Sequence, residues 1–178
     1  MAVTRRDALI GLAALATAAA PHAGAVAQTA TPRRGGVLTV VYTTETHTMF
    51  APGGGGGNPL LVSTKILERL VRDDGEGFSG QLAERWEMQP GGRAIVFHLR
   101  RSATWHDGTP FTAEDVVFNA VEHWKPVAGN PTLRAISGAQ AIDAHTVRIE
   151  FGQSTPQTLA LASLGGTETQ IIPRHLYA

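Results

Sequence analysis

Residues 81–124 read QLAERWEMQPGGRAIVFHLRRSATWHDGTPFTAEDVVFNAVEHW and carry the strongest structural signals of the chain. The first residues of this stretch predict a short helix that leads into a β-hairpin. Pro90-Gly91-Gly92 is a turn signal between two apolar runs, and apolar residues alternate with other residues over 95–100. This period of two predicts a strand with one face turned toward a core.

A tight turn and a capped helix complete the stretch. The sequence WHDGTP at 105–110 favours a tight turn, because glycine tolerates positive φ and proline fixes φ one step later. Thr112 is well placed as a helix N-cap, and Asp115 follows three residues later in a capping-box arrangement. The helix is predicted to end before Pro126, since a residue that precedes proline is biased away from the helical region.

The order of these motifs resembles that of the ABC-transporter extracellular solute-binding proteins of the peptide/nickel class, family 5. The family motif runs roughly LA-x-x-W, then F-x-LR, then W/F-H-D-G-x-P-F/L-T-A-x-D-V. The resemblance covers residues 35–176 and only the N-terminal part of such proteins. A fragment or a prematurely ended product is therefore expected.

This resemblance implies an incomplete α/β lobe with a periplasmic-binding-protein-like fold of type II, in which a mixed sheet has flanking helices. It also implies that the residues of the motif build the lobe and do not contact the solute. These structural residues are Trp86, Trp105, His106, Asp107, Gly108, Pro110, Thr112 and Asp115.

The N-terminus has the three-part layout of a secretory signal. Arg5-Arg6 gives a charged start that resembles a twin-arginine signal, an apolar run covers 8–20, and an A-x-A cleavage candidate ends at Ala27. The apolar run is shorter than the about 20 residues that span a bilayer. Residues 1–27 are therefore predicted to be a signal peptide cleaved near Ala27, by the Tat or the Sec route, with the periplasm as destination. An ordinary buried helix is the alternative.

Composition narrows the possible partners and chemistry. The chain has 178 residues, 15 basic and 15 acidic, so the charge gives no indication of a nucleic-acid partner. The absence of cysteine excludes disulfides, thiolate catalysis and cysteine-based metal sites within this sequence. No cofactor is predicted.

After a flexible lead-in at 28–36, the domain is predicted to occupy residues 37–178 and to open with a buried strand at 36–42. A loop follows, and loops at strand carboxyl ends favour ligands in open α/β sheets. The loop contains five consecutive glycines, but no lysine follows them as a phosphate-binding loop would require. The predicted solute contacts are Thr44, Glu45, His47, Met49 and Phe50 in this loop, together with Thr167. The alternative for the loop is a solvated connection.

The remaining sequence predicts more helices and strands. A helix is expected at 59–70 with proline in its first turn, followed by an acidic turn at 73–77. A second hairpin is expected around 143–145, then a helix at 155–163 and a short strand at 170–173.

No enzyme motif stands out. Seven histidines lie at spacings that match no zinc motif, and there is no Gly-x-Ser-x-Gly. Convergence of His47, His98 and His106 in one pocket would favour the alternative of a secreted metal-dependent hydrolase. A truncated remnant without function is a third possibility.

Taken with the resemblance, the sequence predicts a non-enzymatic, periplasmic substrate-binding component of an ABC importer, which acts by lobe closure. Peptides are the expected solute, with a nickel chelate or another small solute as the alternative. The expected partners are the solute and an ABC permease in the inner membrane, and the complete protein is expected to be a monomer.

Overall fold

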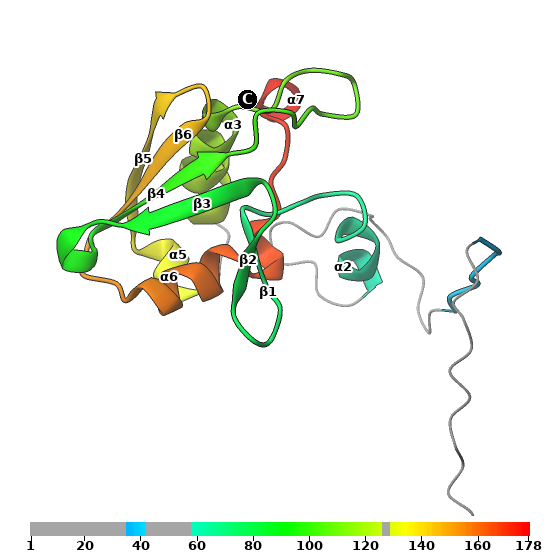
Figure 1. Cartoon of the computed structure of the whole chain (residues 1–178), viewed down its shortest axis with the longest axis horizontal. Helices are drawn as coiled ribbons and strands as arrows, with labels where there is room; N and C mark the ends of the chain where they lie inside the picture. The colour runs from blue at the N-terminus through cyan, green and yellow to red at the C-terminus, as the bar shows by residue number, and fades with distance from the viewer. Residues whose placement is uncertain (1–34, 42–57, 126–128) are drawn as a thin grey trace, which may run out of the picture. The chain divides into compact units, whose positions relative to one another are not determined.

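The computed structural model describes residues 35–41, 58–125 and 129–178. Two compact units divide the chain, Met1–Val40 and Val41–Ala178, and every helix and strand described below belongs to the second (Figure 1). No helix in the described ranges is long and apolar enough to cross a membrane.

A four-stranded antiparallel sheet dominates the second unit, with the strand order β3-β4-β6-β5 (Figure 1). Strands β1 and β2 form a separate two-stranded antiparallel sheet. The strands are β1 Val71–Asp73, β2 Phe78–Gly80, β3 Ala83–Met88, β4 Ala94–Leu99, β5 Ile136–Asp143 and β6 Thr146–Phe151. The predicted α/β class is confirmed, but the predicted mixture of strand directions is not found among the described strands. The pairs β1-β2, β3-β4 and β5-β6 are hairpins, which are antiparallel by construction, and the long connection after β4 leads to β5, which pairs with β6 and not with β4.

Short helices flank these sheets. Helix α3 packs on β5 and β6, and it continues directly into the π-helical segment η2 (Figure 1). Helix α5 packs on α6, which in turn contacts β1. The helices are α2 Asn58–Ser63, η1 Pro90–Gly92, α3 Ala113–Phe118, η2 Asn119–Trp124, α5 Pro131–Arg134, α6 Gln157–Leu164, η3 Thr167–Thr169 and α7 Arg174–Tyr177.

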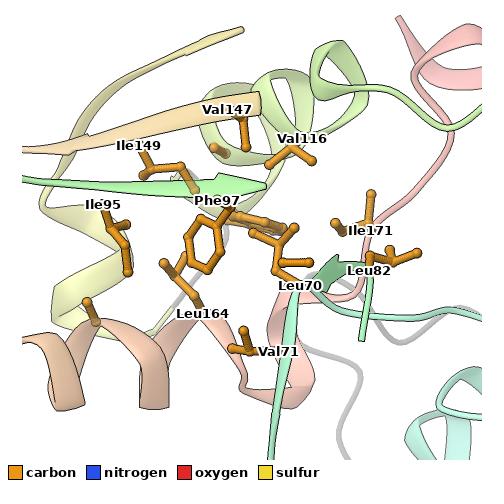
Figure 2. Close-up of a cluster of buried hydrophobic side chains, with 14 of the residues drawn as sticks. Leu70, Val71, Leu82, Ile95, Phe97, Val116, Val147, Ile149, Leu164 and Ile171 are labelled. Carbon is orange, nitrogen blue, oxygen red and sulfur yellow. The ribbon is translucent and has the colours of Figure 1, made fainter. Parts of the chain in front are cut away.

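The core lies against one face of β4 and β6. Phe97 pairs with Val147 and Ile95 pairs with Ile149 in the ladder, so these four side chains share a face of the sheet. All four are fully buried. Figure 2 shows Ile95 and Phe97 directed toward Leu164 of α6, as the predicted period of two at 95–100 requires.

The helix predicted at the start of the 81–124 stretch is wrong. Residues 83–88 form strand β3, which pairs with β4 through Trp86↔Phe97 and Met88↔Ile95. When β4 lies beside this segment, its backbone groups form hydrogen bonds with those of residues 83–88, and Trp86 and Met88 pack against the core. Tertiary pairing therefore overrides the local helix propensity.

The hairpin turn at 90–92 is confirmed. Gly91 and Gly92 have φ of 81° and 66°, values that favour glycine. At Gly92 space is also restricted, because a Cβ there would lie 2.9 Å from the carbonyl oxygen of Thr155. The turn thus needs glycine at Gly92 for two separate reasons.

The predicted strand at 36–42 is wrong over its described part. Residues 35–41 have no regular structure, and Val37 and Leu38 are 97% and 86% exposed. A strand needs a neighbour to receive its backbone hydrogen bonds, and no described residue pairs with this segment.

Three smaller differences concern element ends. Helix α2 ends at Ser63 and not at residue 70, because the following residues turn toward β1. Helix α6 begins at Gln157 and not at residue 155, since Pro156 has a ψ of 142° and serves as the N-cap. The strand predicted at 170–173 is absent, because the side chain of Asn119 occupies the backbone groups of Ile172 that a ladder would use.

The second hairpin is confirmed. Strands β5 and β6 pair around a turn in which the Asp143 carboxylate accepts a hydrogen bond from the His145 N–H at 2.7 Å. The turn predicted at 73–77 is built the same way, with Asp73 accepting from the Gly75 N–H at 2.8 Å. Both turns use a carboxylate to satisfy a backbone donor two residues later.

Candidate functional site

The predicted turn at 105–110 is present and forms one wall of a pocket. The Gly108 N–H donates to the Trp105 carbonyl at 2.9 Å, and the Trp105 N–H donates to the Thr109 carbonyl at 2.8 Å. Gly108 has a φ of 86°, which explains why glycine occupies this position of the turn. The Asp107 carboxylate accepts a further bond from the Thr109 N–H at 2.9 Å. Trp105-His106-Asp107 is therefore held in one conformation by backbone and side-chain bonds together.

The capping box at the start of α3 is also confirmed. The Asp115 carboxylate accepts from the Thr112 N–H at 2.9 Å. Its other oxygen accepts from the Arg174 N–H at 3.0 Å, a contact that joins α3 to the first residue of α7. Asp115 is 5% exposed. Sequence reasoning identified the cap but missed the second bond, because no local pattern relates residues 59 positions apart.

Helix α7 brings a histidine to the turn. The His175 Nε2 lies 2.6 Å from the Asp107 carboxylate, and the His175 ring lies edge-on to Trp105 with centroids 6.5 Å apart. The bond from the Thr109 N–H, and after it the bond from His175, lower the pKa of Asp107 to about 2. Asp107 is therefore ionised at any ordinary pH.

A pocket of about 410 Å³ opens between this turn, α7 and the residues that follow α2. Its size falls within the range of small-molecule sites, about 300–1,000 Å³. Most of its lining is aliphatic or aromatic, and a few polar groups lie among the rest. The lining residues are Ser63, Ile66, Leu67, Trp105, His106, Asp107, Ile172, Pro173, His175, Leu176 and Tyr177.

Trp105 stands between this pocket and a smaller one. Its ring meets Phe111 nearly perpendicularly, with centroids 5.9 Å apart and an interplanar angle of 82°. Its indole N–H is buried, and no described residue accepts a hydrogen bond from it. A tryptophan that only fills a core usually finds a partner for this donor.

The predicted solute contacts fall mainly outside the described residues. Thr44, Glu45, His47, Met49 and Phe50 all lie within 42–57, a range that the structure does not describe. Thr167 is described: it begins η3 and is exposed.

Residues near Thr167 that the sequence did not single out hold its loop in place. The Thr169 hydroxyl lies 2.8 Å from both the Leu164 and the Gly166 carbonyl oxygens. Gln170 is fully buried, and neither atom of its amide has a hydrogen-bond partner among the described residues. A polar residue in a short apolar run gives no sign of such burial.

The described histidines among those considered as metal ligands lie at separate places and have different neighbours. His98 on β4 lies 3.1 Å from Arg85 and 3.7 Å from Glu87, whereas His106 lies in the pocket turn. Burial lowers the pKa of His123. Among the described residues, no group of three or more His, Cys, Asp or Glu could hold a metal ion. His47 lies outside the described residues.

Comparison with known proteins bears on the same stretch of chain. Residues 77–173, more than half of the sequence, match the family described as "Bacterial extracellular solute-binding proteins, family 5 Middle". The chain belongs to this family. The predicted resemblance is therefore confirmed.

Individual relatives agree with the family. The chain is 43% identical over 99 residues to the "Probable deoxycholate-binding periplasmic protein YgiS" of Escherichia coli K12, covering 54% of this chain and 18% of that protein. It is 36% identical over 87 residues to the "Periplasmic oligopeptide-binding protein OppA" of Haemophilus influenzae, covering 48% and 16%. The chain thus spans less than a fifth of these relatives' length.

Solved structures match the fold. The H. influenzae OppA complex with the peptide RPPGFSPFR superposes with a TM-score of 0.60 at 26% identity, covering 71% of this chain and 29% of that one. MoaA from A. tumefaciens R10 with mannopinic acid gives 0.58 at 30% identity, covering 67% and 26%. These relatives are solute-binding proteins and not enzymes, so the alternative of a secreted hydrolase finds no support.

Proposed function

We propose that this chain is part of the periplasmic substrate-binding component of an ABC importer, and that its solute is a peptide. The observation that carries this proposal is the family match over 77–173, which contains the hairpin, the pocket turn and the capped helix. The peptide assignment rests on the similarity to OppA, which is an oligopeptide-binding protein by name and whose solved structure is a complex with RPPGFSPFR. The solute would pass to an inner-membrane permease after lobe closure.

The contacts proposed for the solute are those of the loop at 44–50 and of Thr167. Thr167 favours this role because it is exposed while its neighbour Thr169 is buried and bonded to the loop backbone. An exposed threonine on a loop held by such bonds can offer one hydrogen bond to a peptide main chain without a large ordering cost. Main-chain bonding of this kind gives loose side-chain selectivity.

The test of the solute class is direct. We would isolate the protein from a periplasmic extract under native conditions and determine the masses of the compounds released on denaturation. Oligopeptide masses are the expected result. Release of a bile acid, a sugar acid or a nickel chelate in place of peptides would overturn the peptide assignment and leave the family unaffected.

A pair of threonine variants tests the contact. Thr167→Ala should weaken peptide binding by about 2- to 12-fold, the equivalent of one neutral hydrogen bond at about 0.5–1.5 kcal/mol. Thr158→Ala is the matched control, because Thr158 is also exposed and lies on α6. Equal peptide affinity in both variants would remove Thr167 from the site.

Export to the periplasm is a further part of the proposed function. We infer that residues 1–27 direct the chain to the periplasm and are removed there, which the periplasmic location of the relatives supports. Sequencing the N-terminus of the periplasmic protein should give Gln28 first. A protein that keeps Met1 in the periplasm would contradict cleavage near Ala27.

A further inference from the structure

The pocket beside the 105–109 turn has a negative charge in a largely apolar lining. Among the described residues that line it, Asp107 is the one acidic side chain and none is a lysine or an arginine. The two bonds from Thr109 and His175 lower the pKa of Asp107 to about 2, so this charge persists from mildly acidic to alkaline pH. A site of this composition is electrostatically suited to a cation with an apolar body.

The carboxylate has room for a further donor. Its side chain is 45% exposed, and its two oxygens receive the Thr109 N–H and the His175 Nε2. A carboxylate offers about four lone-pair sites, and the Thr109 side chain also bonds to Asp107, so about one remains. An ammonium group with three N–H donors could use it without displacing a protein partner.

The walls suit the rest of such a molecule. Ile66, Leu67 and Leu176 supply aliphatic surface, and Ile66 and Leu176 are 47% and 67% exposed. Trp105 and Tyr177 add aromatic rings, which attract organic cations more strongly than aliphatic groups do. Covering this surface would remove exposed apolar area from water.

His175 must be considered as a competing cation. A neutral imidazole can donate from Nε2 and leave the pair with a net charge of −1, whereas a protonated imidazole brings the pair to zero. The titratable groups among the described residues that line the pocket are His106, Asp107, His175 and Tyr177. A second cation is therefore favoured when both histidines are neutral.

We propose that this pocket binds a small organic cation, namely an apolar or aromatic body that carries one primary ammonium group, with the ammonium at Asp107 and the body against Trp105, Tyr177 and the aliphatic wall. Thr167, the described residue among the contacts proposed for the transported solute, does not line this pocket. The proposal therefore does not depend on the identity of that solute, and either proposal can fail alone.

The experiment uses the full chain and three probes of similar shape: phenethylammonium, neutral 2-phenylethanol and the anion phenylacetate. Isothermal titration at pH 8 should show saturable binding of phenethylammonium, with the neutral and anionic probes at least ten-fold weaker. Equal binding of the three probes, or no saturable binding of the ammonium, overturns the proposal.

Two aspartate variants locate the charge. Asp107→Asn should weaken phenethylammonium at least ten-fold, while its amide oxygen can still accept from the Thr109 N–H. Asp143→Asn is the matched control, because Asp143 makes the same bond to an N–H two residues later and does not line the pocket. Unchanged binding in Asp107→Asn, or equal losses in the two variants, overturns the assignment.

A third variant avoids the turn altogether. Ile66→Ser alters the apolar wall and should weaken phenethylammonium several-fold, with no change for methylammonium, which has almost no apolar body. Unchanged phenethylammonium binding in Ile66→Ser contradicts placement of the apolar body against this wall.

Discussion

Asn119 offers the sharpest test of how the chain is held together. Its side chain is fully buried at the junction of α3 and η2, and its amide makes three hydrogen bonds. The Nδ2 donates to the Asp115 carbonyl and to the Ile172 carbonyl, each at 2.8 Å, and the Oδ1 accepts from the Ile172 N–H at 3.0 Å. One side chain thus satisfies both backbone groups of a residue that is 3% exposed.

Replacing Asn119 with alanine should destabilise the fold by about 2–6 kcal/mol, because two buried backbone groups lose their partners at about 1–3 kcal/mol each. That is a large share of a typical stability of about 5–15 kcal/mol. Urea unfolding followed by circular dichroism would measure the loss. With a urea slope of about 1–3 kcal/mol per molar, the midpoint should fall by at least about 0.7 M.

Asn130→Ala is the comparison variant. Asn130 caps α5 by accepting from the Thr132 N–H at 2.9 Å, and it is only partly buried. Loss of such a cap costs about 1 kcal/mol, so Asn119→Ala should be clearly the worse of the two. Amide hydrogen exchange gives an independent reading, since the Ile172 N–H should lose its protection in Asn119→Ala. A variant that keeps this protection, or that loses less than Asn130→Ala, would refute the reasoning.

Three further outcomes follow from the structure. Gly92→Ala should cost more stability in urea than Gly91→Ala, because both glycines have positive φ but only Gly92 would also bring a Cβ to 2.9 Å from the Thr155 carbonyl oxygen; equal costs would mean that the close approach relaxes freely. Phe97→Ala should lose about 3–5 kcal/mol, as large aromatic truncations in a core do, and a loss below 1 kcal/mol would place the ring outside the core. Because the folded-state pKa of Asp107 is lowered from 3.8 to about 2, its contribution is present above pH 3.8 and is lost as the pH falls toward 2; urea midpoints between pH 5 and pH 2 should therefore fall less in Asp107→Asn than in the unaltered chain.

Local chemistry was predictable wherever a few neighbouring residues decide it. The turn at Gly108 and the capping box of Thr112 and Asp115 were both predicted, because each depends on the φ of a glycine or on a side chain that reaches three residues. The alternation in β4 correctly placed Ile95, Phe97 and Leu99 in the core, although Val96 between them is also buried.

The failures share one cause, which is dependence on distant partners. Residues 83–88 form a strand only because β4 pairs with them, and residues 36–41 have no such partner among the described residues. The pocket was missed for the same reason: Asp107 and His175 meet across 68 positions. The motif suggested a structural role for Asp107, and only the arrival of α7 gives that carboxylate a histidine neighbour and an apolar pocket.

Because Asn119 bonds to Ile172, this part of the fold cannot be completed during synthesis until both residues have been made. The two residues are 53 positions apart, and synthesis at about 5–20 residues per second delivers the second about 3–10 s after the first. During that interval α3 can coil, but the amide of Asn119 has no Ile172 to hold and must stay hydrated. A nascent chain arrested before residue 172 should therefore expose this helix to proteases and chaperones. Extending the chain so that Ile172 can reach Asn119 should protect the helix.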